Sequence, residues 1–502
     1  MNDMSALPTL PGADASPEDW LALLSGMNLV GGRLVPAAKL LEVIEPATLK
    51  PLASAPASGP AEVSAAVAAA RAAFPFWAAT PARARGAILA RAADLIDAQA
   101  EPLARLLARE TGKALRTECR GELKVAADIL RFHGGLGGEL KGETIPFDPA
   151  VFAATTREPL GVVAAILPWN VPLVLMALKI GPALVAGNAV VVKASEEAPF
   201  ATLAVAAILS DLLPAGALNV VTGTGPDCGA ALTAHPEVAK ITFTGSEAAG
   251  RAVYAAGAAR IIPVSLELGG KSPMIVCADA DMDRTVAGAI AGMRFTRQGQ
   301  SCTAASRIYL HRDVAEAFLS RLRAALGAMV IGDPLAEATD IGTIINAKQK
   351  ATVDRYVALA EAHPGAEVIR CGRLPEDPAL APDLFALPTL LLGLPEDHPC
   401  VREEIFGPVA VIQIWDDYED VIARANDSGY GLAATVWTRD LRVAMDATKR
   451  LNAGYVQVNQ NLTIQPNLSY GGFGNSGLGK EASLEAMREH FTRSKTIVFA
   501  MD

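Results

Sequence analysis

The sequence has few cysteines and no closely spaced pair of them. Six cysteines occur in 502 residues, and none belongs to a Cys-x-x-Cys pair. The six histidines are dispersed, without a His-Glu-x-x-His segment. These absences argue against a disulfide scaffold and a zinc site, so we expect no metal. The scattered cysteines are typical of a reduced cytoplasmic protein.

Runs of basic residues and long unbroken apolar runs are also missing. The net charge is −10, so neither nucleic acid nor a membrane surface is an expected partner. The most apolar region, 161–192, is interrupted by proline, asparagine and lysine, which excludes a bilayer span. Residues 1–5 are not basic and lead into a proline-containing segment, so we expect no signal peptide.

The remaining composition is that of a multidomain globular enzyme. Hydrophobic residues make up 51% and charged residues 20% of the chain, and this length predicts two or three domains. Residues 1–60, rich in proline, alanine and glycine, predict an arm along the surface. Residues 60–131 have helical apolar spacing. Six prolines within 374–399 predict an irregular surface segment.

Short β-branched segments alternate with helical segments between residues 161 and 266. This alternation predicts a parallel sheet with helices on both faces, which binds ligands at the carboxyl ends of its strands. The expected strands are 161–167, 189–193, 218–221, 240–243 and 261–266, and the expected helices are 173–184, 199–213, 226–233 and 247–256. A second α/β unit is predicted after Glu267.

Two short segments contain a candidate nucleophile and a candidate base. Cys302 lies in Gly299-Gln-Ser-Cys302, a small and polar surrounding that suits a reactive thiol. Glu267 opens Glu267-Leu-Gly-Gly-Lys271 and offers a carboxylate base. Taken singly, Cys302 is better interpreted as a buried cysteine and Glu267 as a surface charge.

Three segments are candidates for binding a dinucleotide. The glycines of 223–229 are spaced one residue too widely for Gly-x-Gly-x-x-Gly. Gly245 and Ser246 lie between an expected strand and helix, where amides can face a diphosphate, although Ser246 alone is also an ordinary helix cap. Lys193 and Glu196 can hydrogen-bond ribose hydroxyls, and the carboxylate favours NAD over NADP. The alternative for this pair is a solvated loop.

Together these segments and several others form the pattern of a known family. From about residue 40 to the C-terminus, the chain resembles the NAD(P)-dependent aldehyde dehydrogenase superfamily. The matching segments are Pro168-Trp-Asn170-Val-Pro172, Val191-Val-Lys193, Phe243-Thr-Gly-Ser246, Leu266-Glu267-Leu-Gly-Gly-Lys271, Gly299-Gln300-x-Cys302, Glu403-Glu404-Ile-Phe406-Gly-Pro408 and Gly471-Gly-Phe-Gly-Asn-Ser476-Gly-x-Gly-Lys-Glu481.

The resemblance implies a role for each candidate residue. Cys302 would attack the aldehyde, the Asn170 amide would hold the oxyanion, and Glu267 would activate the water that hydrolyses the thioester. Lys179 and Glu481 match a proton exit route, whose alternative is a structural ion pair. The implied NAD-binding residues are Trp169, Lys193, Glu196, Gly245, Ser246, Leu268, Glu404 and Phe406. The implied substrate tunnel is lined by Val171, Leu175, Leu178, Thr296, Ile464 and Tyr470.

The resemblance also implies an α/β fold with a Rossmann-type cofactor domain, a catalytic domain and a small oligomerisation hairpin. The expected cofactor domain is 1–137 with 158–267, the catalytic domain is 268–481, and the oligomerisation elements are 138–157 and 482–502. The hairpin would dock the tail 494–499 of a neighbouring subunit. We therefore expect a homodimer or homotetramer.

The expected reaction is oxidation of an uncharged aliphatic or aromatic aldehyde to its acid with NAD. The implied tunnel contains no cation, and we expect Arg297 at the surface or bonded to backbone, so a substrate carboxylate would lack a partner. The alternative is a semialdehyde dehydrogenase, possibly CoA-acylating, although Glu267 argues against transfer to CoA. A cysteine esterase and a silent scaffold are further alternatives, which the filled cofactor and catalytic positions disfavour.

Overall fold

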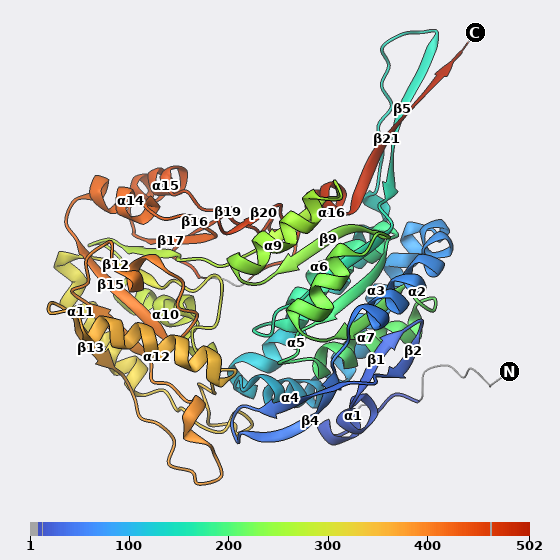
Figure 1. The fold of residues 1–502 in the computed structure, drawn as a ribbon. Coiled ribbons are helices and arrows are strands. Elements are labelled where there is room, and N and C mark those ends of the chain that lie inside the picture. The colour runs from blue at the N-terminus through green and yellow to red at the C-terminus, as the bar shows by residue number, and fades with distance from the viewer. Residues whose placement is uncertain (1–8, 13, 462–463, 502) are drawn as a thin grey trace.

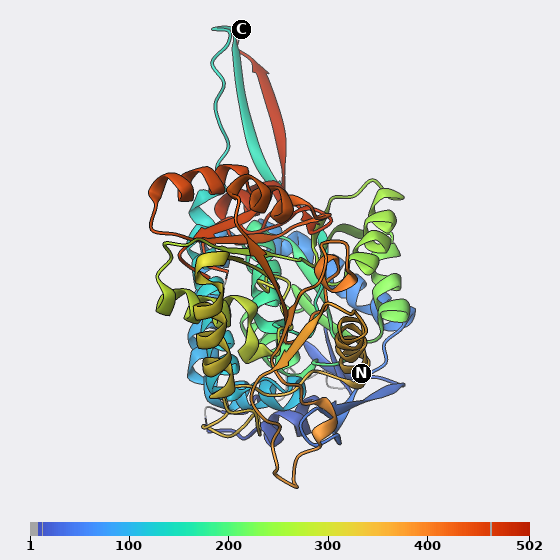
Figure 2. The ribbon, with the colours of Figure 1, turned by 90° about the vertical axis from the view of Figure 1, so that its left-hand side faces the viewer.

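The computed structural model describes residues 9–12, 14–461 and 464–501. Residues 1–5, on which the expectation of no signal peptide depends, lie outside this part. Two sheets with flanking helices form the body, and a two-stranded ribbon projects from it (Figures 1 and 2). The predicted α/β fold is confirmed.

The first sheet has eight strands, and its central strands are parallel. All five strands expected between 161 and 266 are present and lie side by side. In spatial order the sheet contains β2 (Arg33–Pro36), β1 (Met27–Val30), β8 (Leu218–Thr222), β7 (Ala189–Ala194), β6 (Val162–Ile166), β9 (Val238–Thr244), β10 (Val264–Glu267) and β20 (Gly477–Leu478).

Helices cover both faces of this sheet. Successive side chains of a strand point to opposite faces, and here the side chains on both faces are apolar. Val163 and Ala165 of β6 belong to one core cluster and Val162 and Ala164 to another. The first face packs against α3 (Ala82–Ala98), α4 (Ala100–Thr111), α5 (Arg120–Gly135), α6 (Pro172–Ala186) and α7 (Phe200–Leu212), and the second against α2 (Pro60–Ala79), α8 (Ala230–Ala234) and α9 (Glu247–Ala258). A π-helical turn, η1 (Leu115–Cys119), leads into α5, and a second, η3 (Gly225–Gly229), leads into α8.

The expectation of a surface arm over residues 1–60 is wrong. This segment contains α1 (Pro17–Leu24), the sheet strands β1 and β2, and a hairpin of β3 (Leu40–Glu45) and β4 (Lys50–Pro56). Trp20 and Leu29 are fully buried. Burial of such large apolar side chains stabilises the segment against the sheet and overrides its loop-like composition.

The second sheet follows after Glu267 and is also mainly parallel. Its order is β13 (Glu367–Arg370), β14 (Thr389–Leu392), β15 (Val409–Trp415), β12 (Arg307–His311), β11 (Pro273–Val276), β17 (Ala433–Trp437) and β18 (Tyr455–Val458). Its helices are α10 (Met282–Met293), α11 (Arg312–Gly327), α12 (Ala347–Glu361), α13 (Pro399–Arg402), α14 (Tyr418–Asn426) and α15 (Leu441–Arg450). The prediction that 374–399 is irregular fails at β14, whose apolar residues pair on both sides between flanking prolines.

The projecting ribbon consists of β5 (Val151–Pro159) and β21 (Thr492–Ala500) (Figure 1). The two strands pair antiparallel within one chain, from Thr492 opposite Pro159 to Ala500 opposite Val151. The expectation that the tail docks on the hairpin of a neighbouring subunit is therefore replaced by an intrachain pairing. The helix α16 (Leu484–Phe491) sits at the base of the ribbon.

Within the described residues, no single helix has the length and apolar character needed to cross a membrane, and only the pair α2 and α3, bent by 117°, meets that test together.

Candidate active site

Strand register brings four of the candidate segments to one edge of the first sheet. Ile166 pairs with Lys193 on one side and Phe243 on the other, and Thr244 pairs with Glu267. These residues end four neighbouring parallel strands, where ligands bind in open α/β sheets. The segments that start there contain Trp169 with Asn170, Lys193 with Glu196, Gly245 with Ser246, and Glu267 with Leu268.

Cys302 lies on a turn that other segments approach closely. Gly299, with φ of +62°, precedes it, and a Cβ there would overlap the Gly407 carbonyl, so the close approach requires glycine. Cys302 is partly exposed, whereas the other five cysteines are buried. Its Sγ lies 3.5 Å from the hydroxyl of Tyr470. Burial raises the pKa of the thiol to about 11, against which the hydrogen bond from Tyr470 acts.

Glu267 is buried at the end of β10, and one of its oxygens has no hydrogen-bond partner among the described residues. Burial and the nearby charge of Glu481 raise its pKa well above the usual carboxyl value, while Lys179 and Lys480 act in the opposite direction. Gly471 passes beside this carboxylate, where a Cβ would lie 2.7 Å from Oε1. A buried carboxyl group with an open oxygen and a raised pKa is suited to general-base chemistry.

Lys179 and Glu481 form a fully buried ion pair with a separation of 2.7 Å. Thr242 donates to the same carboxylate oxygen at 3.4 Å. A proton route and a purely structural ion pair would both show this contact. The proton route therefore stays a prediction.

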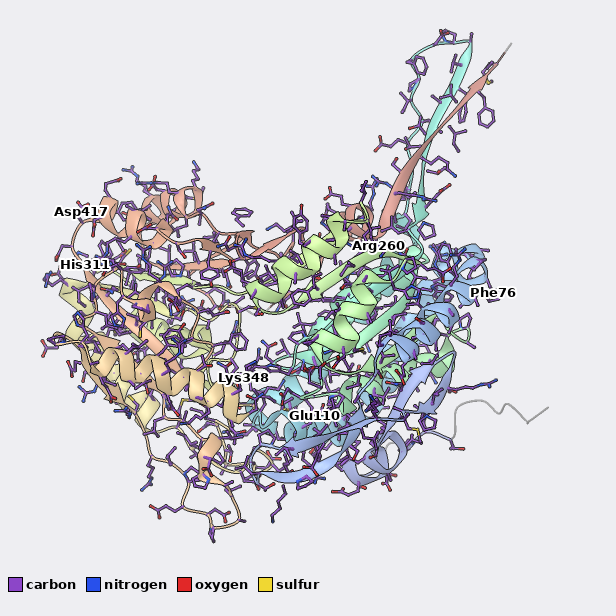
Figure 3. All side chains as sticks on the ribbon, viewed as in Figure 1. Phe76, Glu110, Arg260, His311, Lys348 and Asp417 are labelled. Atoms are coloured by element: carbon purple, nitrogen blue, oxygen red, sulfur yellow. The ribbon has the colours of Figure 1, made fainter. Side chains whose placement is uncertain are left out.

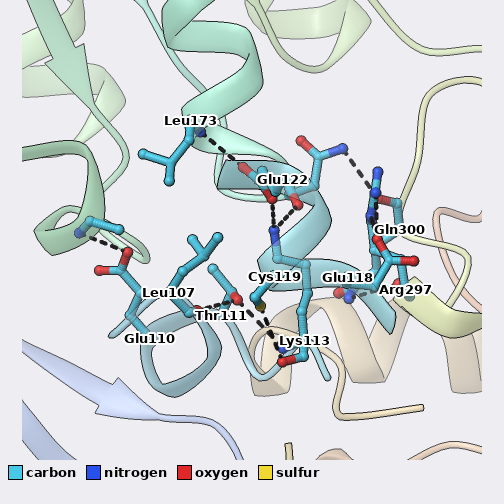
Figure 4. A network of polar contacts seen from close by, with 12 residues as sticks. Leu107, Glu110, Thr111, Lys113, Glu118, Cys119, Glu122, Leu173, Arg297 and Gln300 are labelled. Atoms are coloured by element: carbon cyan, nitrogen blue, oxygen red, sulfur yellow. Dashed lines mark hydrogen bonds and ion pairs between the residues drawn. The ribbon is translucent and has the colours of Figure 1, made fainter. Parts of the chain in front are cut away.

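Asn170 is held by a buried network that includes Lys113 before η1 and Glu122 of α5; Figure 4 labels both of these residues. The backbone carbonyl of Asn170 accepts a hydrogen bond from the Lys113 ammonium group at 2.9 Å. Lys113 also forms an ion pair with Glu122. Glu122 also accepts the backbone N–H of Leu173 in the first turn of α6. The Asn170 side-chain amide donates to the Gln300 carbonyl at 3.1 Å, so it lies against the nucleophile turn. Its role toward an oxyanion stays a prediction.

The turn that contains Cys302 is held by Glu118 of η1, whose partner Arg297 corrects our expectation. Arg297 is neither at the surface nor bonded to backbone alone. It is largely buried and donates to Glu118 at 2.8 Å, and Thr296 donates to the other oxygen of this carboxylate. The Arg297 charge lowers the Glu118 pKa against the effect of burial. An arginine within the fold requires such a carboxylate, because an unpaired buried charge is costly.

Sequence reasoning missed the supporting groups Lys113, Glu118 and Glu122. Their signal was present, because Glu118 and Glu122 lie at helical spacing among Leu115, Cys119 and Leu123, all buried. Glu110, labelled in Figure 3, is also buried. It accepts the first backbone N–H groups of α7 (Figure 4). Charged residues inside an apolar helical stripe mark buried polar networks.

Arg294 is a second cation near the nucleophile. It ends α10 in a left-handed conformation, with φ of +57°. Burial lowers its pKa to about 10, and the charges of Glu118, Cys302 and Tyr470 act on it. Arg294 is not one of the six expected tunnel residues, and sequence reasoning did not anticipate it.

The residues expected to bind the cofactor have suitable chemistry for a dinucleotide. Lys193 and Glu196 pair at 2.7 Å, and the glutamate is partly exposed. Ser246 caps α9 by accepting from Ala249, and the hydroxyl of buried Thr244 beside it has no protein partner. The free N-terminus of α9 can bind a diphosphate.

Further groups complete this cradle. Glu404 accepts from the Gly270 amide at 3.0 Å, and burial raises its pKa to about 7. Phe406 packs edge-to-face on Trp169 with ring centroids 5.5 Å apart. Leu268 is buried below α9, where a Cβ on Gly250 would meet its side chain.

Five of the six expected tunnel residues lie in one apolar region. Leu175, Leu178 and Tyr470 belong to the core cluster against which Val171, Ile464 and Cys302 pack. Thr296 lies apart from that cluster, on the turn before Cys302. In the described part of the chain, no three His, Cys, Asp or Glu residues are grouped as a metal site.

Comparison with known proteins agrees with this geometry. The sequence model of the Aldehyde dehydrogenase family matches residues 35–497. Phenylacetaldehyde dehydrogenase of Pseudomonas fluorescens is 41% identical over 484 residues, covering 94% of this chain and 95% of that protein. Betaine aldehyde dehydrogenase of Rhizobium leguminosarum bv. trifolii (strain WSM2304) is 40% identical over 464 residues, covering 92% and 94%.

A solved structure gives the same result at the level of the fold. The NAD+ complex of aldehyde dehydrogenase from Bacillus cereus superimposes with a TM-score of 0.93 at 33% identity, covering 98% of this chain and all of that chain. The predicted resemblance is confirmed, and the chain belongs to the aldehyde dehydrogenase family.

Proposed function

We propose that this protein oxidises uncharged aldehydes to carboxylic acids with NAD in a reduced cytoplasm. The observation that carries the proposal is the placement of Cys302 and the buried Glu267 beside the cofactor cradle at the edge of the sheet. The six unpaired cysteines favour the reduced compartment.

The residues divide the reaction into two stages. The Cys302 thiolate forms the S–C bond to the aldehyde carbon, and the carbonyl electron pair moves to oxygen, which the Asn170 amide stabilises. NAD held by Lys193, Glu196, Ser246 and Glu404 would supply the acceptor for the hydride that leaves this carbon. Glu267 then takes a proton from water, whose oxygen attacks the resulting thioester and releases the acid and the thiolate. Lys179 and Glu481 offer that proton a path away from Glu267.

Formation of NADH with an aldehyde, followed by absorbance with and without CoA, tests this function directly. We expect NADH and free acid without CoA and no acyl-CoA when CoA is present. Acyl-CoA formation would instead favour the acylating alternative, and ester cleavage without NADH formation would favour the esterase.

The protein is expected to prefer NAD over NADP because the Glu196 carboxylate repels a 2′-phosphate. Replacing Glu196 by serine should raise the NADP/NAD ratio of kcat/KM by roughly tenfold to a hundredfold, as expected when a repulsion of about 1.4 to 3 kcal/mol is removed. Glu197→Gln removes a neighbouring carboxylate as the matched control. A wild-type preference for NADP contradicts the assignment.

A carboxylate-bearing semialdehyde is the second candidate substrate, and Arg294 is the observation that favours it. Glu118 already pairs with Arg297, and Arg294 is a further cation whose charge interacts with Cys302. The apolar surface of Leu175, Leu178 and Val171 favours the uncharged substrate.

We expect benzaldehyde and hexanal to exceed succinic semialdehyde in kcat/KM by about a hundredfold, because burying an unpaired carboxylate costs a few kcal/mol. A panel of aldehydes measures this ratio in the wild type and in Arg294→Met. If succinic semialdehyde is the better substrate and loses its advantage in Arg294→Met, the second candidate is correct.

We also propose that the protein forms a homodimer or homotetramer. The projecting ribbon supports this proposal, since its side chains Phe152, Val498 and Phe499 are exposed and apolar. Light scattering of the purified protein measures the state.

A further inference from the structure

The hydroxyl group of Tyr470 makes a contact that is not needed if this residue only lines a substrate tunnel. Its side chain is 1% exposed, yet its hydroxyl points at the Sγ of Cys302 and makes a hydrogen bond with it at 3.5 Å. Lining an apolar tunnel requires only the ring, and phenylalanine would supply the ring without a buried hydroxyl.

The hydroxyl is held in place by the backbone and by a second ring. Tyr470 pairs with Glu481 through both backbone hydrogen bonds, of 3.0 and 2.7 Å. Its ring packs edge-to-face on Tyr455, with centroids 5.7 Å apart. A donor fixed in this way loses little conformational freedom when its acceptor becomes charged.

Ionisation of Cys302 changes the nature of this contact. Beside a thiol, the hydrogen bond joins two neutral groups, and sulfur is a weak partner in either direction. Beside a thiolate, only the phenol can donate, and the bond becomes charge-assisted. Burial and the charge of Cys302 raise the Tyr470 pKa well above its usual value, so the phenol keeps its proton.

We propose that Tyr470 is a thiolate-stabilising residue whose hydroxyl donates a hydrogen bond to ionised Cys302 and promotes its ionisation. The proposal rests on the proposed function for the role of Cys302 as nucleophile. The thiol proton passes to solvent, and Tyr470 remains a neutral donor throughout.

Other charged groups face the same sulfur and set the background for this effect. Glu267 at the end of β10 and Glu404 before β15 oppose ionisation, whereas Arg297 favours it. Arg294 at the end of α10 also interacts with the thiol. None of these groups is changed when only the hydroxyl of Tyr470 is removed.

The test is the pH dependence of Cys302 alkylation by iodoacetamide in the protein without aldehyde or NAD. Tyr470→Phe keeps the ring and should raise the apparent thiol pKa by about one to two units, a tenfold to hundredfold change in the ionisation constant. Tyr455→Phe is the matched control, since its ring contacts Tyr470 and it should leave the profile in place. Cys302→Ser identifies alkylation at other cysteines.

A second measurement does not depend on the variant folding. Site-specific incorporation of 3-fluorotyrosine at position 470 makes this phenol a stronger donor and should lower the Cys302 pKa in the otherwise unchanged chain. An unchanged profile in Tyr470→Phe, or in the fluorinated protein if that variant does not fold, overturns the proposal. Because alkylation uses neither aldehyde nor NAD, this failure is distinct from turnover by a chain lacking Cys302, which would overturn the proposed function itself.

Discussion

Cys302→Ala is expected to abolish aldehyde oxidation, with a loss of kcat of roughly 10⁴-fold or more, as for removal of other enzymatic nucleophiles. No other cysteine can replace the thiol, because the remaining five are buried. NAD binding should persist, since the cradle around α9 and Glu404 does not include the sulfur.

NADH formation measures the loss, and fluorescence titration with NADH measures retained binding. Cys277→Ala is the matched control, because Cys277 is buried beside the second sheet and should be dispensable for turnover. Appreciable turnover by purified Cys302→Ala would exclude this residue as the nucleophile.

Glu267→Gln is expected to trap the acyl-enzyme and to lower steady-state turnover by roughly 10²–10⁴-fold. Glutamine fills the same space at the end of β10 but cannot take the proton from water. The first turnover should still release NADH, because that stage does not use the carboxylate. Mass spectrometry of the variant with aldehyde and NAD should detect the thioester on Cys302.

The pH dependence supplies an independent check on Glu267. Burial raises its pKa, so the carboxyl group is protonated and inactive as a base at low pH, and hydrolysis should accelerate as the pH rises through that value. Glu316→Gln on the exposed side of α11 should leave this rise unchanged. Wild-type steady-state rates and no trapped thioester in Glu267→Gln would contradict the assignment.

The sheet around the site could be predicted because its signals are local. Each strand between 161 and 266 is a short apolar run bounded by a helix with its own spacing, and both patterns are readable within about ten residues. Parallel pairing brings the carboxyl ends of these strands, which contain Lys193, Phe243 and Glu267, to one edge of the sheet. The carboxyl edge was thus predictable as the binding edge.

Three parts of the fold depended on contacts that no local pattern reveals. Residues 1–60 have a loop-like composition, and the burial of Trp20 and Leu29 against the sheet is not visible in it. The strand β14 is only four residues long and lies between prolines. The pairing of β5 with β21 joins segments more than 300 residues apart. In each case tertiary packing overrides composition.

The candidate site shows the same division. Cys302, Glu267 and Glu481 were proposed because each lies in a recognisable segment, whereas Lys179 was named only through the resemblance; the roles of all four stay predictions. Arg297 was misplaced because its partner Glu118 lies 179 residues away in the sequence. Its ionic environment could not be read from neighbouring residues, and Arg294 was overlooked for the same reason.

The pairing of β20 with β10 has a consequence for synthesis of the chain. Glu267 lies opposite Gly477, and Leu268 donates to the Ser476 carbonyl. Tyr470 and Glu481 also come from this late segment. A ribosome adding roughly 5–20 residues per second therefore makes the nucleophile well before it makes the groups that surround it and the base. Cys302 and Glu267 are therefore made many residues before the segment that packs beside them, and their surroundings are completed only after that segment has emerged.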